Sequence, residues 1–163
     1  MHSGNPDTLT SFPSYNRARI VDLVPYARNA RTHSPAQVAQ IAASIREFGW
    51  TNPILIDGER GVIAGHGRLL AAHQLGMTEV PTLELSHFTP AQRRAYVLAD
   101  NRLALSAGWD EDLLRVELAE LGAEGFDLEL TGFDADEIAG FLAEPLSGLT
   151  DPDEVPPPPE IPV

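Results

Sequence analysis

The sequence has 163 residues, of which 43% are apolar and none is cysteine. This length and composition fit one small globular domain with an appendage, and the lack of cysteine excludes disulfides and thiol chemistry. No apolar run approaches the roughly 18 residues that span a bilayer, and the N-terminus lacks the pattern of a signal peptide. We therefore expect a cytoplasmic protein without a membrane segment.

Charge is distributed unevenly along a chain whose net charge is −13. Residues 17–103 hold ten arginines and seven acidic residues, a net of +3, whereas residues 104–163 hold one arginine and sixteen acidic residues, a net of −15. There is no lysine. Arginine suits bidentate contacts with phosphate, although a GC-rich coding bias explains its use equally well. The pattern indicates a mildly basic body followed by an acidic region.

The first elements are predicted by caps and alternation. Residues 1–16 are polar and rich in turn formers, which predicts a flexible N-terminus. Residues 19–23 are expected to form a strand, and 26–33 an arginine-bearing loop. A helix should follow, because Ser34 is an N-cap with proline next to it and glutamine three residues on. Gly49 should end this helix.

The next elements complete a small domain over residues 17–103. Alternation and turn residues predict strands at 53–57, 62–64 and 80–85, with a turn at 58–61. Helices are expected over 68–75 and from 90 to about 100. The mixture of short strands and helices predicts an α+β fold.

The C-terminal part has a different character. Residues 104–144 are predicted to form an acidic helical appendage, with an amphipathic helix over 110–121 and another capped by residues 134–137. Residues 145–163 are rich in proline, with four prolines in succession. Such a segment is typical of a semi-rigid linker or tail. We favour a linker that precedes a further domain.

Gly65-His66-Gly67-Arg68 is the strongest local motif. A strand leads into a glycine loop and then a helix, where free amides and the helix dipole favour an anion. Arg68 adds a charged fork that suits phosphate. The motif is neither a P-loop nor a dinucleotide-binding fingerprint. A tight turn with a surface arginine is the alternative.

The order of motifs along about residues 19–103 resembles the N-terminal domain of the ParB family, which sulfiredoxins and a free-serine kinase share. The resemblance implies a ParB/sulfiredoxin-like fold. It identifies Gly65, His66, Gly67 and Arg68 with the family's Gly-Glu-Arg-Arg phosphate box, in which Arg68 takes the place of the second arginine. His66 and Gly67 replace the two charged residues before it, so one phosphate ligand is missing.

The resemblance also implies the other ligands of a nucleotide. Asn29 and Arg31 match the first arginine-bearing box, which lies over the nucleotide. Asp100, Asn101 and Arg102 resemble the Glu-Asn segment that holds Mg²⁺ in CTP-binding members, and the carboxylate and amide of the first two suit a hard cation. Asn101 could instead be a helix C-cap.

Two residues are candidates for a catalytic role. His66 could ligate a phosphate, act as a general base or simply fill the loop, and Asp100 is the other catalytic candidate. His66 lies where sulfiredoxins have their catalytic cysteine, so sulfiredoxin activity is excluded. His33 could contact a phosphate from the arginine-bearing loop. No histidine pair has the spacing of a zinc site.

Several functions stay open at this stage. The preferred one is a DNA-associated module that binds CTP or ATP with Mg²⁺ and hydrolyses it slowly, with a homodimer as the implied assembly. The layout also resembles the N-terminal region of phage and bacterial DNA methyltransferases, although this chain has no methylase motif. The alternatives are a non-enzymatic domain that positions a methyltransferase on DNA, a metal-dependent DNA nuclease, and a kinase for a small hydroxyl substrate.

Overall fold

The computed structural model describes residue 13 and residues 15–143. Most of the expected flexible N-terminus and all of the Pro-rich segment 145–163 lie outside the described residues. The chain divides into two compact units, Met1–Gly108 and Trp109–Val163. Within the described ranges, no helix has both the length and the apolar character that crossing a membrane requires.

The first unit is built on a four-stranded sheet with the order β1-β4-β2-β3. β4 pairs antiparallel with β1 and parallel with β2, and β2 pairs antiparallel with β3. The sheet is therefore mixed, and the predicted α+β fold class is confirmed. The strands are β1 (Tyr15–Arg19), β2 (Ile54–Ile56), β3 (Val62–Ala64) and β4 (Glu79–Glu84).

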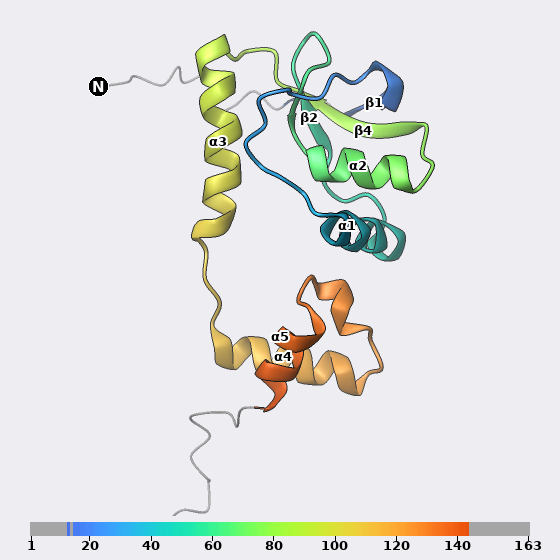
Figure 1. Ribbon diagram of the computed structural model, residues 1–163, viewed down its shortest axis with the longest axis vertical. Coiled ribbons are helices and arrows are strands. Elements are labelled where there is room, and N and C mark those ends of the chain that lie inside the picture. The colour runs from blue at the N-terminus through green and yellow to red at the C-terminus, as the bar shows by residue number, and fades with distance from the viewer. Residues whose placement is uncertain (1–12, 14, 144–163) are drawn as a thin grey trace, which may run out of the picture. The chain divides into compact units, whose positions relative to one another are not determined.

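Three α-helices accompany this sheet: α1 (Pro35–Phe48), α2 (His66–Gln74) and α3 (Pro90–Ser106). α1 begins as predicted, since the Ser34 hydroxyl accepts a hydrogen bond from the Gln37 amide at 3.1 Å. It ends at Gly49, whose φ of 76° favours glycine. α1 packs against α2, and α2 packs against the sheet (Figure 1).

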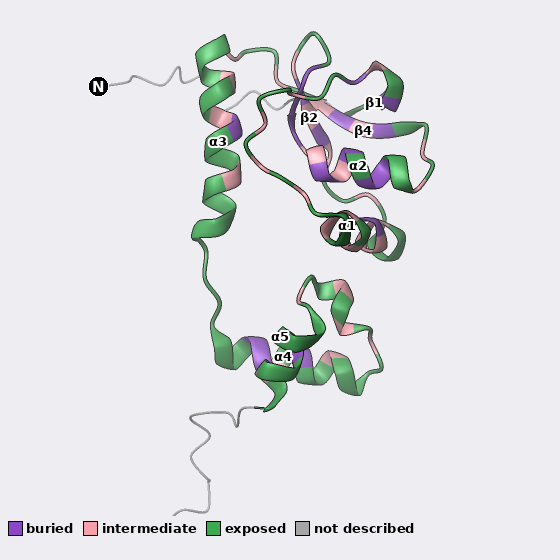
Figure 2. Cartoon of the chain, in the orientation of Figure 1, coloured by how far each residue is buried: buried purple, intermediate pink, exposed green. Residues whose placement is uncertain are grey.

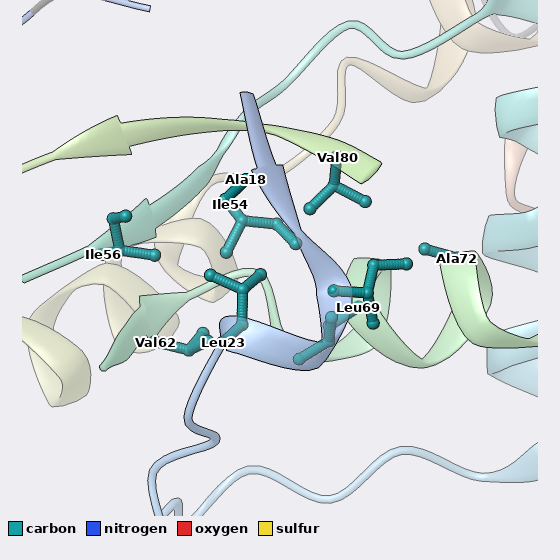
Figure 3. Close-up of a cluster of buried hydrophobic side chains, with 9 residues drawn as sticks. Ala18, Leu23, Ile54, Ile56, Val62, Leu69, Ala72 and Val80 are labelled. Atoms are coloured by element: carbon teal, nitrogen blue, oxygen red, sulfur yellow. The ribbon is translucent and has the colours of Figure 1, made fainter. Parts of the chain in front are cut away.

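The core of the first unit lies between the sheet and α2. Figure 2 shows the buried residues gathered on β2, β4 and the inner side of α2, and Figure 3 shows the apolar cluster itself. Ile54 and Val62 are completely buried, and Trp50 and Met77 pack against the edge of the cluster. Its buried members are Ala18, Ile20, Leu23, Ile54, Ile56, Val62, Leu69, Ala72 and Val80.

Several predicted boundaries were wrong. The first strand, expected over 19–23, lies earlier as β1, and Ile20–Asp22 form a 3-10 helix, η2. Pairing between β1 and β4 decides this, because it aligns Tyr15 with Leu83 and Arg19 with Glu79. β1 thereby includes two residues of the expected flexible N-terminus.

Two helices also differ from expectation. α2 begins at His66 instead of residue 68, because Gly65 adopts φ 101° and its carbonyl accepts the Leu69 amide at 2.9 Å. α3 continues to Ser106, well beyond the expected end near residue 100. Asn101 therefore lies inside a helix, and the C-cap alternative is wrong.

The second unit contains α4 (Glu111–Ala123), the 3-10 helix η3 (Leu128–Thr131) and α5 (Ala135–Ala143). Its buried apolar side chains are Leu114, Leu118 and Ile138. α5 has the predicted cap: Asp134 and Glu137 each accept the other's backbone amide, at 2.9 and 2.8 Å. η3 was not predicted.

Candidate functional site

A cavity of about 170 Å³ lies where α2 begins, between the arginine-bearing loop, α1 and α3. It contains most of the candidate residues from the sequence, which lie on three separate segments. They are Asn29, Arg31, Gly65, His66, Gly67, Arg68, Asp100 and Asn101. His33, Gln37, Ile41, Ile63 and Ala64 complete its lining.

The glycine loop gives the cavity its floor. β3 is buried along its whole length and leads directly into Gly65, whose left-handed conformation turns the chain into α2. The first amides of a helix have no partner within it, so those at the start of α2 can receive an anion. The partial positive charge of the helix N-terminus acts in the same direction.

Arg68 folds back across this loop. Its Nη2 donates to the Pro53 carbonyl at 3.1 Å, and the guanidinium would lie 3.1 Å from a Cβ on Gly65. Its Nε is buried and has no hydrogen-bond partner among the described residues. Burial lowers the pKa of Arg68, while Asp100 and Tyr15 oppose that shift. The side chain is thus a partly desolvated cation at the cavity wall.

His66 is held by the arginine-bearing loop. Its Nε2 accepts a hydrogen bond from the Tyr26 amide at 3.1 Å. Burial, followed by the charges of His33 and Arg93, lowers the pKa of His66, which favours the neutral ring. With Nε2 engaged as an acceptor, Nδ1 carries the proton. In this arrangement His66 can donate to an anion, and its basic nitrogen is already occupied.

Arg31 connects the loop to α3. Its Nη1 donates to Asn101 Oδ1 at 3.1 Å, and its amide donates to Asn29 Oδ1 at 3.2 Å. Asn101 Nδ2 donates in turn to the Val97 carbonyl at 2.8 Å. Both ends of the Asn101 amide are therefore used in bracing Arg31 against the helix.

Among the described residues that line the cavity, Asp100 is the only acidic one. Asp100 is exposed, and its Oδ1 accepts from the Tyr96 hydroxyl at 3.4 Å. Burial and the nearby Asp100 raise the pKa of Tyr96. Arg102 is exposed and does not line the cavity, so the structure does not bring it together with the other candidates.

The cavity offers few ligands to a divalent cation. No group of three or more His, Cys, Asp or Glu side chains comes together in the described part of the chain. Asp100 offers one carboxylate, and Asn101 Oδ1 already accepts from Arg31. Mg²⁺ is often held by one or two carboxylates together with the phosphates of its ligand, and the cavity fits Mg²⁺ in that form only.

Sequence reasoning missed some of the residues that support the site. Gln37 was recognised as a helix cap, yet its side chain also accepts from His33 Nδ1 at 3.1 Å. Tyr26 acts through its backbone amide, for which no side-chain pattern gives a signal. Arg93 lies 5.1 Å below the Tyr26 ring and 3.1 Å from Asp57 Oδ2, and supports the loop from outside the cavity.

Comparisons with known proteins agree with this architecture. The family described as ParB N-terminal domain matches residues 16–101, and the ParB-methyltransferase HTH domain matches residues 112–163. The ParB-like nuclease domain-containing protein YnaK of Escherichia coli is 56% identical over 75 residues, which cover 46% of this chain and 86% of that protein.

A solved structure shows the same fold. The C-terminally truncated chromosome-partitioning protein ParB of Caulobacter crescentus, complexed with CTP-γ-S, has a TM-score of 0.57 and 21% identity, covering 78% of this chain and 70% of that chain. Sulfiredoxin of Arabidopsis thaliana is a looser likeness, with a TM-score of 0.45 and 18% identity over 52% of this chain and 98% of that chain. With the family match extending over more than half of its residues, this chain belongs to the ParB N-terminal domain family.

Proposed function

We propose that the first unit binds a nucleoside triphosphate, CTP or ATP, with Mg²⁺, as a DNA-associated module that serves a DNA methyltransferase. One observation carries the nucleotide part: Arg31 of the arginine-bearing loop and Arg68 at the start of α2 face a single cavity from two segments of the chain. Fixed cations and helix amides that converge in this way suit a polyphosphate.

The charged groups that line the cavity favour the binding of an anion. Two guanidinium groups and a helix N-terminus face one carboxylate, that of Asp100. The cavity of about 170 Å³ is smaller than the roughly 300–1,000 Å³ of most small-molecule sites. It is therefore sized for phosphate groups, with the nucleoside extending beyond it. Mg²⁺ would be held by Asp100 and would neutralise phosphate charge when bound.

The family match and the charge distribution support the DNA and methyltransferase part. The ParB-methyltransferase HTH domain covers residues 112–163. However, residues 109–143 hold eleven acidic residues and one arginine, which opposes contact with the phosphates of DNA. We therefore assign DNA contact to the basic residues 17–103 and a docking role to the acidic appendage, 104–144. Affinity for DNA should be modest and steeply dependent on salt.

Calorimetric titration with CTP and ATP in the presence of Mg²⁺ tests the nucleotide part. We expect saturable binding by the wild-type chain and about tenfold or greater weakening in Arg68→Ala, because a charged hydrogen bond contributes roughly 1.5–3 kcal/mol. Arg102→Ala is the matched control, because this exposed arginine lies outside the cavity. If the wild-type chain binds neither CTP nor ATP at millimolar concentration, the proposal is refuted.

Nuclease activity is a second candidate, because the Escherichia coli relative carries the words nuclease domain in its name. The described residues give nuclease activity little support, because they assemble no carboxylate cluster that could hold a pair of metal ions. Incubation of supercoiled plasmid with the protein and Mg²⁺ or Mn²⁺ tests it. Nicking that disappears in Asp100→Asn would favour this candidate over simple nucleotide binding.

A further inference from the structure

We propose that His33 is a phosphate-binding residue of the cavity, that it occupies the space of a side chain on residue 67, and that it binds the anion as an imidazolium. This inference rests on the proposed nucleotide site and adds a ligand to it. Residue 67 is where the resemblance to the family left one phosphate ligand missing.

Packing around Gly67 is the first argument. A Cβ on Gly67 would lie 2.9 Å from His33 Cε1 and 3.0 Å from His33 Nδ1. It would also lie 2.9 Å from Cδ1 of Ile41 on α1. Real Cβ atoms essentially never approach other atoms as closely as 2.9 Å, so a residue with a Cβ at position 67 would require the His33 ring and the Ile41 side chain to shift. The glycine therefore makes room for a ring that comes from another segment.

Hydrogen bonding of the ring is the second argument. His33 Nδ1 donates to Gln37 Oε1 at 3.1 Å, which leaves Nε2 available to a ligand. Because Nδ1 already carries a proton, Nε2 can donate to phosphate only when the ring is doubly protonated. Phosphate binding at Nε2 is therefore coupled to the uptake of a proton by the ring.

Four charged or titratable side chains line the cavity together with His33. Arg31 belongs to its own loop, His66 and Arg68 to α2, and Asp100 to α3, while α1 faces it with neutral side chains. Among these, His66 is already committed as an acceptor to the Tyr26 amide. The two histidines of the cavity thus differ: Nε2 of His66 is taken by the Tyr26 amide, whereas the bond of His33 Nδ1 to Gln37 leaves Nε2 of His33 for a phosphate.

The test compares His33→Ala with His73→Ala, an exposed histidine on α2 outside the cavity. Titrations use Mg-CTP, Mg-ATP and inorganic triphosphate near pH 6.5 and near pH 8.5, and each protein's melting temperature confirms its fold. We expect His33→Ala to weaken binding about tenfold near pH 6.5 and much less near pH 8.5, because binding through His33 requires the uptake of a proton. His73→Ala should bind as the wild type does.

Proton uptake gives a second readout. Binding heats measured in two buffers of different ionisation enthalpy report the protons taken up. The ligand's own titration contributes equally to both proteins, so the difference between wild type and His33→Ala isolates His33. We expect the wild type to take up more protons than His33→Ala. Equal uptake would overturn the assignment of an imidazolium.

A double-mutant cycle tests the claim about space. Gly67→Ala should weaken triphosphate binding strongly in the wild type, because the new methyl group displaces His33, and much less in the His33→Ala background. Displacement of Ile41 is common to both backgrounds and cancels. Equal losses in the two backgrounds would overturn the claim that His33 fills the place of residue 67.

The outcomes separate the two proposals. If Arg68→Ala weakens binding while His33→Ala matches the wild type at both pH values, the assignment of His33 fails and the nucleotide site stands. If the wild type binds none of the three anions, the nucleotide site fails, and the assignment of His33 fails with it.

Discussion

Gly65→Ala is expected to destabilise the first unit more than any other glycine substitution compared below. Two costs combine at this position. A left-handed backbone costs a residue with a Cβ roughly 1–2 kcal/mol, and Gly65 has φ 101°. The methyl group would also lie 3.1 Å from Arg68 Nη2 and 3.2 Å from Ile54 Cγ1, and crowding of this kind costs about 1–3 kcal/mol. We expect a total loss of about 2–4 kcal/mol in the free energy of unfolding.

Two other glycines separate these costs. Gly76 has φ 69° with no atom within 4 Å of an added Cβ, so Gly76→Ala should show the backbone cost alone. Gly108 has neither feature, and Gly108→Ala should change stability by less than about 0.5 kcal/mol. The expected order of destabilisation is therefore Gly65, then Gly76, then Gly108.

Urea denaturation followed by Trp50 fluorescence measures these differences. Trp50 packs at the edge of the core, and a Trp109→Phe background removes the signal of the second unit. The thermal midpoint of Gly65→Ala should fall by roughly 10 °C or more, since 1 kcal/mol corresponds to about 4–8 °C in a domain of this size. A loss for Gly65→Ala no larger than that for Gly76→Ala would refute the crowding argument.

Three further predictions follow from hydrogen bonds of the site and its support. The pKa of His66 is lowered in the folded state, so the unfolded chain binds more protons in acid. The free energy of unfolding should therefore fall as the pH drops below about 6.5. His66→Gln should reduce this pH dependence in denaturation experiments, and an unchanged dependence would contradict the prediction. Asp57 Oδ1 accepts the backbone amides of Glu59 and Gly61 at 2.9 and 2.7 Å, and Oδ2 pairs with Arg93. Asp57→Ala removes all three interactions, so we expect the free energy of unfolding, measured by urea denaturation, to fall by about 2 kcal/mol. Asn101→Ala frees Arg31 from α3 and should weaken triphosphate binding by less than Arg31→Ala does, whereas equal losses in calorimetry would show that bracing is the whole role of that arginine.

Local signals predicted the parts of the fold whose hydrogen bonds join near neighbours. The cap of α1 depends on Ser34 and Gln37, and its end on Gly49, all within one turn of the helix ends. β2, β3 and the turn between them were predicted for the same reason. β1 was misplaced, because its register depends on β4, which lies sixty or more residues away along the chain.

The candidate site residues likewise divide into those that the sequence indicated and those whose position depends on the tertiary structure. The motif around Gly65 and the segment at Asp100 were recognised by their resemblance to a family, and the structure places both at one cavity. Arg102 was predicted as a ligand because it follows Asp100 and Asn101. Successive residues of a helix are about 100° apart, and the Arg102 side chain faces solvent. The binding roles of these residues stay predictions until ligands are titrated.

By itself, the sequence determined most of the strands and α-helices, the basic body, the acidic appendage and the glycine turn that leads into α2, because these depend on composition and on residues within a few positions of one another. Only the tertiary structure decided that Arg31 meets Asn101 across 70 positions and that His33 lies over Gly67. Such contacts arise when α1 packs against α2 and α3 packs against β3, and their distances depend on every side chain between them. The motif of Gly65 to Arg68 thus indicated a phosphate site, and packing decided which side chains could complete it.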